Sequence, residues 1–340
     1  MSHAATHHRE VRLAARPQGP LNEGHFEIAT VPVPEPGPGQ ALVRNRLMAV
    51  YASMRTLMNE EPGLPMPRFA LGEPLHGLAI GEVVDAPGAP AGSGLVPGAL
   101  VQHRRGWREF AVVEAADALP VADGPHDDPA AYLSMGPTAW IGVTAGAEVR
   151  AGDTVFVSAA AGSVGSFAGQ LARLRGAERV IGSTSSAAKG EILVRELGYD
   201  AAVLRGAGPI EDQLRAAAPE GIDAVLDLVG GEQLCAALAL ANRRARVALL
   251  GAMSGQASGG TTAPVELDTF DLISRGIVIR GMPGLDHAHL VPEAHREIGR
   301  GLRDGTLTFP HARLKGIERA PQALNELLEG RHVGSVLVEL

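Results

Sequence analysis

Short apolar runs separated by turn residues fill the first 130 residues. The stretches are HFEIATVPVPEPGPGQALVRNRLMAV, HGLAIGEVVDAPG and PGALVQHRRGWREFAVV, and Pro or Gly breaks each of them after a few residues. Runs this short, with turn residues this frequent, are typical of a compact β barrel rather than of parallel strands joined by helices. The pattern therefore predicts an all-β domain over residues 1–130.

The pattern changes after residue 131, where apolar β runs alternate with amphipathic stretches of helical length. Strands are predicted at residues 154–159, 179–183, 201–204, 224–228, 246–251 and 277–281. Helices are predicted between them at residues 163–175, 186–197, 210–218 and 232–241. Alternation of this kind predicts a doubly wound parallel sheet over residues 131–299.

The two ends of the chain complete this division. The C-terminal stretch contains one amphipathic helix, APQALNELLEG, and a last apolar run, GSVLVEL, whose composition resembles the strands of the opening domain. We therefore expect residues 300–340 to return to that domain. The opening MSHAATHHRE, with three of the 12 histidines, is interpreted as a disordered lead-in, with a metal-binding tail as the lesser alternative. The predicted fold class is α/β with two domains.

Charge and cysteine content narrow the functional classes. The chain has 30 Lys and Arg against 38 Asp and Glu, and the basic residues are scattered, which disfavours nucleic acid or an anionic membrane as partner. The sequence has neither a long apolar run nor a leader pattern. Cys235, the single cysteine, excludes an internal disulfide. We expect a soluble, cytoplasmic protein that acts on a small molecule.

The stretch VSAAAGSVGSFAG joins an apolar strand, a turn of small residues and the start of a helix. Ala160, Gly162 and Gly165 occupy an A-x-G-x-x-G pattern, a relaxed form of the dinucleotide fingerprint. The middle glycine lets the backbone approach a pyrophosphate, whose charge the helix N-terminus favours. The pattern predicts a dinucleotide site, and a plain strand-to-helix corner is the alternative.

The end of the second predicted strand indicates which dinucleotide binds. An acidic residue there would bind the 2′-hydroxyl of NAD, but RVIGSTSSAAKGE has no carboxylate before Glu191. Ser183 and Lys189 offer a hydroxyl and a cation, and Arg205 follows the third strand. These groups suit a 2′-phosphate, so the predicted cofactor is NADPH. In the alternative interpretation, Lys189 and Arg205 are solvated surface charges.

Several motifs follow one another in an order known from one family. They are MRTLMNEEP, LGEPLHGLAIGEVV, GWREFAVV, MGPTAW, VSAAAGSVGSFAGQLARLRGA, DAVLDLVGGE and GRHVGSVLVEL. In them the chain resembles the zinc-free medium-chain dehydrogenase/reductase superfamily, above all its prostaglandin reductase and alkenal double-bond reductase branch, with quinone reductases next. The resemblance implies a GroES-like β barrel domain, a Rossmann domain, and a homodimer formed through edge strand 277–281.

The resemblance also implies the cofactor contacts, motif by motif. The pyrophosphate would be held by Gly162, Ser163, Val164 and Gly165. Lys189 would bind the 2′-phosphate, and Arg205 stands where the branch usually carries a tyrosine beside it. The positions that line the nicotinamide and its ribose are Thr138, Met253, Met282 and Gly284. His332 stands where the branch often has asparagine.

Zinc is not expected. Zinc-dependent relatives use cysteine and histidine ligands together with a four-cysteine lobe. In this sequence Tyr51 falls at the position of the first cysteine, and Cys235 lies on a predicted helix. His76 has no partner ligands at usable spacing, and we expect it to pack in the core or a cleft.

Without a metal, the expected reaction adds hydride to the β-carbon of an activated alkene, and the resulting enolate needs a hydrogen-bond donor and a proton. The branch usually supplies tyrosines for this. Here Gln256 and Ser53 replace them, and glutamine cannot give up a proton. Tyr51 or Ser53 is the candidate donor, although Tyr51 could equally be a wall residue that only packs on substrate.

Two further residues and two other functions stay open. Arg55 is a candidate to bind a substrate carboxylate or to play a structural part, and Gln256 is a candidate substrate contact. The first functional prediction is an NADPH-dependent reductase of α,β-unsaturated carbonyl compounds. An NADPH:quinone oxidoreductase is the alternative, and an NADPH-binding protein with little turnover is the third.

Overall fold

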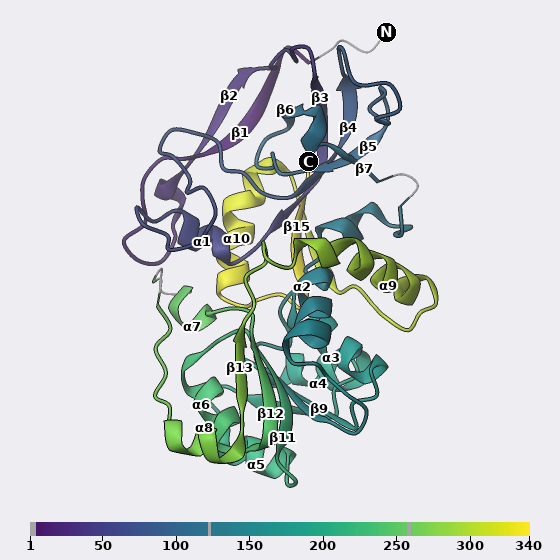
Figure 1. Ribbon diagram of the computed structural model, residues 1–340. Helices are drawn as coiled ribbons and strands as arrows, with labels where there is room; N and C mark the ends of the chain where they lie inside the picture. Colours follow the sequence, from purple (N-terminus) through teal and green to yellow (C-terminus); the bar gives the residue numbers. More distant parts are fainter. Residues whose placement is uncertain (1–4, 122–123, 257–259, 261) are drawn as a thin grey trace. The chain divides into compact units, whose positions relative to one another are not determined.

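A six-stranded parallel sheet organises the second part of the chain (Figure 1). Its strand order is β10-β9-β8-β11-β12-β13, so the chain moves outward from β8 in one direction and then returns to add β11 on the other side. This is the doubly wound order, and it confirms the predicted Rossmann sheet. The strands are β8 Thr154–Val157, β9 Arg179–Thr184, β10 Ala201–Leu204, β11 Ile222–Asp227, β12 Ala241–Leu249 and β13 Val278–Gly281.

Alternate side chains of the central strands enter two separate cores. Val155 and Val157 of β8 join one hydrophobic cluster, whereas Phe156 joins the other. Because successive strand side chains point to opposite faces, both faces of the sheet must be covered. The helices are α2 Gly136–Ile141, α3 Gly165–Leu174, α4 Ala187–Glu196, α5 Ile210–Ala217, α6 Gly231–Ala239, α7 Met253–Gln256, α8 Thr269–Arg275 and α9 Val291–Arg303.

Helix α9 was not expected from the sequence. Its segment VPEAHREIGRGLR is rich in charge and contains two internal glycines, so its apolar positions are few. The buried ones, Ala294 and Ile298, pack in the same cluster as Phe167 of α3. The predicted helices at 163–175, 186–197 and 210–218 agree with α3, α4 and α5 within two residues.

An antiparallel sheet built on the long strand β3 forms the other part of the chain. It runs in the order β14-β15-β3-β4-β5-β7, and β6 also pairs with β3, while β1 and β2 form a separate hairpin. Helix α10 is the helix predicted in the C-terminal segment, whereas α1 lies within residues 1–130, where the all-β expectation was therefore incomplete. The elements are β1 His7–Leu13, β2 Phe26–Pro32, β3 Gln40–Val50, α1 Ser53–Leu57, β4 Ala79–Asp85, β5 Leu100–His103, β6 Phe110–Glu114, β7 Leu119–Pro120, β14 His311–Lys315, α10 Ala320–Leu328 and β15 Ser335–Glu339.

The last strand returns to the first sheet, as predicted. β15 pairs antiparallel with β3, with Val336 opposite Val50 and Glu339 opposite Leu47. Three consecutive residues of β15, Val336 to Val338, are almost inaccessible to solvent. A strand this buried cannot be removed from the sheet without exposing apolar surface and unpaired backbone groups.

The interpretation of the N-terminus as a disordered lead-in is wrong from His7 onward. His7 to Leu13 form β1, which pairs residue by residue with β2. Val11 and Leu13 lie fully buried, and the backbone N–H of Val11 donates to the Trp107 carbonyl at 2.9 Å. The alternating apolar positions Val11 and Leu13 in HHREVRL therefore lie in a strand, even though four charged or histidine residues precede them.

The computed structural model describes residues 5–121, 124–256, 260 and 262–340, and its contacts group the chain into two units. The first comprises residues 1–133, 312–331 and 335–340, and the second comprises 134–311 and 332–334. This differs from the expected boundary at 300, because α9 and the segment after it pack on the parallel-sheet core through Leu302, Leu307 and Phe309. Of the helices within the described residues, none has the length and apolar character needed to cross a bilayer.

A methyl group at Gly165 should destabilise the second unit. An added Cβ would lie 2.5 Å from Ala160 Cα and 2.6 Å from the Ala159 carbonyl oxygen, both of which are backbone atoms that cannot rotate away. We expect Gly165→Ala to lower the free energy of unfolding by about 2 kcal/mol, measured from the denaturant midpoint. Gly281→Ala is the control, because its Cβ would meet no atom within 4 Å; equal losses in both variants would contradict the packing argument.

Candidate active site

The turn between β8 and α3 has the shape that the glycine pattern predicted. Ala159 adopts a left-handed backbone conformation with φ +48°, and the Gly162 N–H donates to its carbonyl at 2.9 Å. The turn then enters α3 at Gly165, where the absence of a side chain lets the helix approach the Ala160 backbone. The N-terminus of α3 therefore lies at the carboxyl end of β8, next to the point where the strand order reverses.

Ser183 holds this turn in place from the neighbouring strand. Its hydroxyl accepts the Ala159 N–H at 2.9 Å and donates to Gln233 Oε1, and its carbonyl accepts the Ala160 N–H at 2.8 Å. The residue is 1% exposed. Ser183 was predicted to contact the cofactor, but its only hydroxyl proton is already used within the protein. Its geometry favours a part in shaping the turn.

Asp227, which sequence reasoning did not single out, fixes the two loops at the reversal point. Its carboxylate accepts from the Ser158 hydroxyl at 2.8 Å and from the Gly230 N–H at 2.8 Å, and Ser158 Oγ accepts the Leu228 N–H at 2.7 Å. Burial raises the pKa of Asp227, and these hydrogen bonds oppose that rise. A carboxylate ending an apolar strand, as in DAVLDLVGGE, was the pattern that could have identified it.

Lys189 and His332 lie together beside the glycine turn. Lys189 Nζ donates to the His332 carbonyl at 2.9 Å, and burial lowers the pKa of the lysine. Two residues further, the Gly334 N–H donates to the Ala161 carbonyl at 2.9 Å. The structure thus brings together three of the predicted cofactor regions: the turn, the start of α4 and the segment 332–334.

Arg205 is exposed and reaches the same region through its backbone. Its N–H donates to the Thr184 carbonyl at 2.9 Å, which fixes it beside the end of β9. Ser186 caps α4, and its hydroxyl accepts the Lys189 N–H. Lys189 therefore follows β9, and Arg205 follows β10. Both strands lie on the side of β8 where the 2′-phosphate was expected.

The remaining cofactor candidates follow the other strands of the sheet. Met253 begins α7, and its N–H donates to the Leu228 carbonyl at 3.0 Å. Met282 directly follows β13, donates its N–H to Leu249 and packs on the parallel-sheet core. Gly284 is exposed, and Thr138 lies half-buried on α2. Ser163 and Val164 belong to the glycine turn itself.

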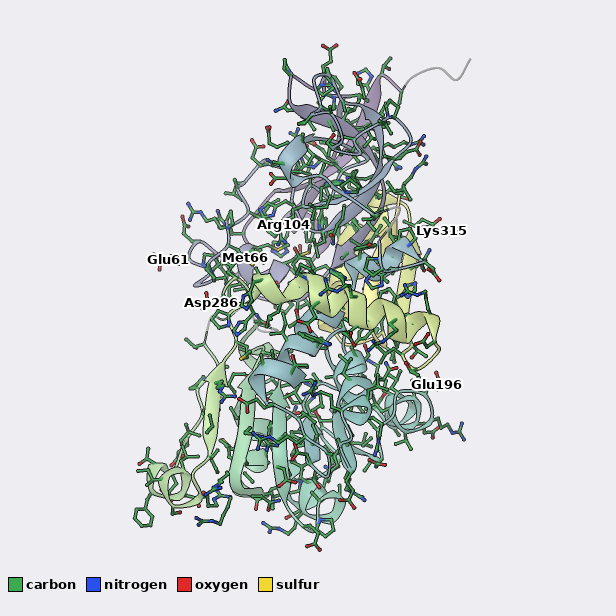
Figure 2. All side chains as sticks on the ribbon, turned by 45° about the vertical axis from the view of Figure 1, so that its right-hand side comes forward. Glu61, Met66, Arg104, Glu196, Asp286 and Lys315 are labelled. Atoms are coloured by element: carbon green, nitrogen blue, oxygen red, sulfur yellow. The ribbon has the colours of Figure 1, made fainter. Side chains whose placement is uncertain are left out.

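Tyr51 and Ser53 lie in the first unit, at the end of β3 and the start of α1. The Tyr51 side chain packs against the apolar core there, and burial raises the pKa of its hydroxyl. The positive charge of Arg104, labelled in Figure 2, lowers that pKa again. Ser53 is half-buried on the first turn of α1. Gln256 lies in the second unit, at the end of α7, where its N–H donates to the Ala252 carbonyl.

The guanidinium of Arg55 is engaged inside the first unit. It donates to the carbonyls of Pro17 and Gly19 at 3.2 and 3.0 Å and to Asn59 Oδ1 at 2.9 Å. The residue is 2% exposed. This arrangement favours the structural alternative for Arg55 over contact with a substrate carboxylate.

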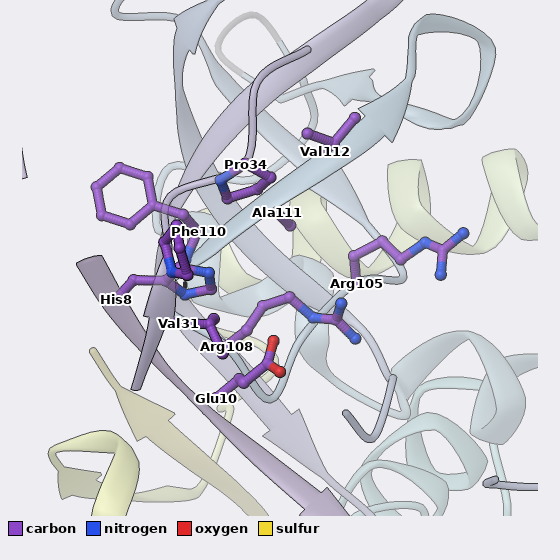
Figure 3. A pocket seen from close by; sticks show the side chains of 10 residues that line it. His8, Glu10, Val31, Pro34, Arg105, Arg108, Phe110, Ala111 and Val112 are labelled. Atoms are coloured by element: carbon purple, nitrogen blue, oxygen red, sulfur yellow. Dashed lines mark hydrogen bonds between the residues drawn. The ribbon is translucent and has the colours of Figure 1, made fainter. Parts of the chain in front are cut away.

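A cavity of about 350 Å³ opens in the first unit, and none of the predicted site residues is among those that line it (Figure 3). Arg105 and Arg108 line it together with Glu10 of β1. Glu10 is ion-paired with Arg12 at 2.7 Å. The other lining residues are His8, Val31, Pro32, Pro34, Phe110, Ala111 and Val112.

His, Cys, Asp and Glu side chains do not gather in threes as a metal site would require, as far as the described residues extend. Cys235 lies on α6 and makes a weak contact with the Glu266 carbonyl at 3.7 Å. The His76 ring packs edge-on against Phe69, and burial lowers its pKa. His76 thus has the packing role expected from the sequence.

Comparison with known proteins assigns both parts of the chain. The family model for the N-terminal domain of oxidoreductase matches residues 9–121, and the zinc-binding dehydrogenase model matches residues 163–299. The chain is 30% identical to the NADP(+)-dependent 2-alkenal reductase of Nicotiana tabacum, covering 97% of this chain and 96% of that protein. It belongs to the medium-chain dehydrogenase/reductase superfamily.

Within this superfamily the chain falls in the branch of prostaglandin, alkenal and curcumin reductases. It is 29% identical to the NADPH-dependent curcumin reductase of Escherichia coli, covering 96% of this chain and 95% of that protein. The crystal structure of CurA from Vibrio vulnificus in complex with NADPH superimposes with a TM-score of 0.88 at 27% identity, covering 97% and 98% of the two chains. The branch predicted from the motifs is confirmed.

Proposed function

We propose that the protein is an NADPH-dependent reductase that transfers hydride to the C=C bond of an α,β-unsaturated carbonyl compound. The observation that carries the proposal is the glycine turn with Lys189 beside it, in a member of the alkenal and curcumin reductase branch. CurA, which superimposes over nearly the whole chain, was solved with NADPH. The chain is thus an NADP-dependent oxidoreductase of the double-bond reductase group, and its substrate is the part that we propose.

The residues present suit NADPH on structural grounds. The turn from Ala159 to Gly165 leads into the N-terminus of α3, where the negative charge of a pyrophosphate would be favoured. Lys189 has three ammonium donors, so its bond to the His332 carbonyl is compatible with a phosphate contact. Arg205 is exposed and directly follows β10, which is the second strand from β8 in the sheet. The cofactor, once bound, supplies a hydride.

Tyr51 is the proposed proton donor of the reaction. Hydride addition at the β-carbon shifts the double bond to the α-carbon and the carbonyl carbon and places the C=O electron pair on oxygen. The enolate so formed needs a donor at oxygen and a proton at the α-carbon. Gln256 can donate a hydrogen bond but no proton. The chain has three tyrosines, and Tyr199 is buried with its hydroxyl bonded to the Gly165 carbonyl at 2.6 Å. Tyr132 is also buried, with its ring edge-on against His126. Tyr51 is therefore the tyrosine that we propose, with Ser53 as the other candidate.

A substrate panel tests the proposal. NADPH oxidation should be followed with enones, enals, enoyl thioesters and quinones, with the saturated product identified by mass spectrometry. We expect turnover with alkene reduction, because a relative that is 30% identical over nearly the whole chain is an NADP(+)-dependent 2-alkenal reductase. Turnover of quinones alone would favour the quinone oxidoreductase instead, and tight NADPH binding without any turnover would favour a binding role.

Removing the Lys189 ammonium should weaken NADPH binding and leave NADH binding unchanged. A hydrogen bond to a charged group contributes about 2 kcal/mol, so Lys189→Ala should raise the Kd for NADPH by about 30-fold. Fluorescence titration or calorimetry measures this. Lys315→Ala removes an exposed lysine on β14 and is the control. An equal loss for NADH would assign Lys189 to the structure of α4 rather than to the 2′-phosphate.

We further propose a homodimer formed through the edge of the parallel sheet. β13 is the last strand in the order, and the preceding helix α8 exposes Phe270 and Ile273, each at 78%. An open strand edge beside apolar side chains favours pairing with a second copy.

Charges on that helix should therefore separate the copies. We expect the double variant Phe270→Glu and Ile273→Glu to have the mass of one chain in light scattering after gel filtration, where the unmodified protein has the mass of two. Val96→Glu is the control, because Val96 is an equally apolar, 61% exposed residue of the first unit. A single-chain mass for the unmodified protein would contradict the proposal.

A further inference from the structure

Arg104 is an exposed arginine on the loop that follows β5, in the sequence HRRGWRE (Figure 2). Its guanidinium has no hydrogen-bond or ion-pair partner within the part of the chain that the structure describes. Its neighbour Arg108, by contrast, donates to the Leu75 carbonyl at 2.9 Å and to the Gly106 carbonyl at 3.2 Å. Arg108 thus holds the loop, whereas the side chain of Arg104 is available to a ligand.

Backbone hydrogen bonds fix Arg104 beside Tyr51. The Gly77 N–H donates to the Arg104 carbonyl at 3.2 Å, and the Gly106 N–H donates to the Gly77 carbonyl at 3.0 Å. On its other side Gly77 meets Tyr51, because a Cβ built on Gly77 would lie 3.1 Å from the Tyr51 hydroxyl oxygen and 2.5 Å from Met54 Cε. The arginine backbone and the phenol therefore meet at one glycine that has no room for a side chain.

Electrostatics agree with this placement. Among the described residues, the groups that act on the pKa of Tyr51, apart from burial, are the positive charge of Arg104 and the backbone of Leu78, and both lower it. Burial lowers the pKa of His76, and the charges of Arg105, Arg108 and, least of the three, Arg104 lower it further. A positive charge that stabilises the phenolate form of Tyr51 would stabilise any other oxyanion at the same place.

We propose that Arg104 is a catalytic residue of the reductase, whose guanidinium binds the carbonyl oxygen of the substrate and stabilises the enolate while Tyr51 supplies the proton. This inference rests on the proposed function. In the proposed step, the hydride that NADPH supplies forms the new C–H bond at the β-carbon. The alkene electron pair becomes the double bond between the α-carbon and the carbonyl carbon, and the C=O electron pair moves to the carbonyl oxygen, held by Arg104. The Tyr51 O–H bond then breaks, its proton forms the C–H bond at the α-carbon, and water reprotonates the phenolate.

The division of labour follows from the chemistry of the two groups. A guanidinium keeps its proton at any pH at which the protein is folded, so it offers charge and paired donors but no proton. A phenol offers one proton; burial raises the pKa of Tyr51, and the charge of Arg104 offsets part of that rise. Gln256, at the position of the missing tyrosine, offers neither charge nor proton, so the charged donor must come from elsewhere in the chain.

Kinetics of Arg104→Gln on an uncharged enone test the assignment. Loss of one oxyanion donor lowers kcat by about 100-fold or more, so we expect that loss with KM changed much less. Arg104→Lys keeps the charge without the paired donors and should recover part of kcat. Arg105→Gln is the matched control, because it removes the same charge from the next, equally exposed residue of the loop, and its kcat should stay near that of the unmodified protein.

A second readout does not depend on turnover. Tyrosinate absorbance after a rapid jump to alkaline pH, compared with Tyr51→Phe, reports the titration of Tyr51. Because the charge of Arg104 favours the phenolate, Arg104→Gln should move that titration to higher pH, and Arg105→Gln should not. If the substitutions instead disrupted the structure of the loop, both variants would show a changed Tyr51 titration and changed unfolding midpoints.

Several results would overturn the inference. If the unmodified protein reduces uncharged enones and Arg104→Gln does so equally well, Arg104 has no catalytic part and the proposed function stands. If Arg104→Gln loses affinity for carboxylate-bearing substrates alone, the arginine binds substrate charge rather than the enolate. If the unmodified protein reduces no enone, the proposed function falls, and this assignment falls with it.

Discussion

The second unit depends on one close approach, between the start of α3 and the backbone at Ala160. No side chain fits between them, because a Cβ at Gly165 would lie within 3 Å of three backbone atoms. This contact sets the position of the helix N-terminus relative to β8, and hence where backbone N–H groups can meet an anion. Tyr199 reinforces it by donating its hydroxyl to the Gly165 carbonyl from the other side.

Polar groups buried around the turn keep that geometry rigid. Asp227, Ser158 and Ser183 each bond to backbone groups of the loops at the carboxyl ends of β8 and β11. Because unpaired polar groups are costly in this environment, each of these bonds restricts the loops to one conformation. The turn is therefore shaped before any ligand arrives, which reduces the ordering cost of binding.

Much of the fold could be predicted from the sequence, because the parallel strands are short continuous apolar runs that alternate with amphipathic stretches of helical length. Helix α9 could not, since its burial rests on two residues, Ala294 and Ile298, within a charged segment. The N-terminal strand was missed for a similar reason, because histidines hid an alternation that only its pairing with β2 makes evident. Tertiary contacts override local composition in both cases.

The candidate site could likewise be predicted only in part. The glycine turn and Lys189 follow from spacing on either side of a predicted strand. Ser183 was chosen for its hydroxyl, and only the structure reveals that this hydroxyl is already bonded within the sheet. Asp227 and Arg104 depend on neighbours that are distant in sequence, Ser158 in one case and Tyr51 in the other. The spacing of residues along the chain does not identify such pairs.

The segment 332–334 has a consequence for the order in which the contacts of the second unit form. It lies between α10 and β15, yet its backbone bonds to Ala161 and Lys189, far earlier in the chain. During synthesis these bonds can form only after residues 332–334 have been made. The glycine turn therefore gains these contacts later than the rest of the second unit, whose other residues end at His311.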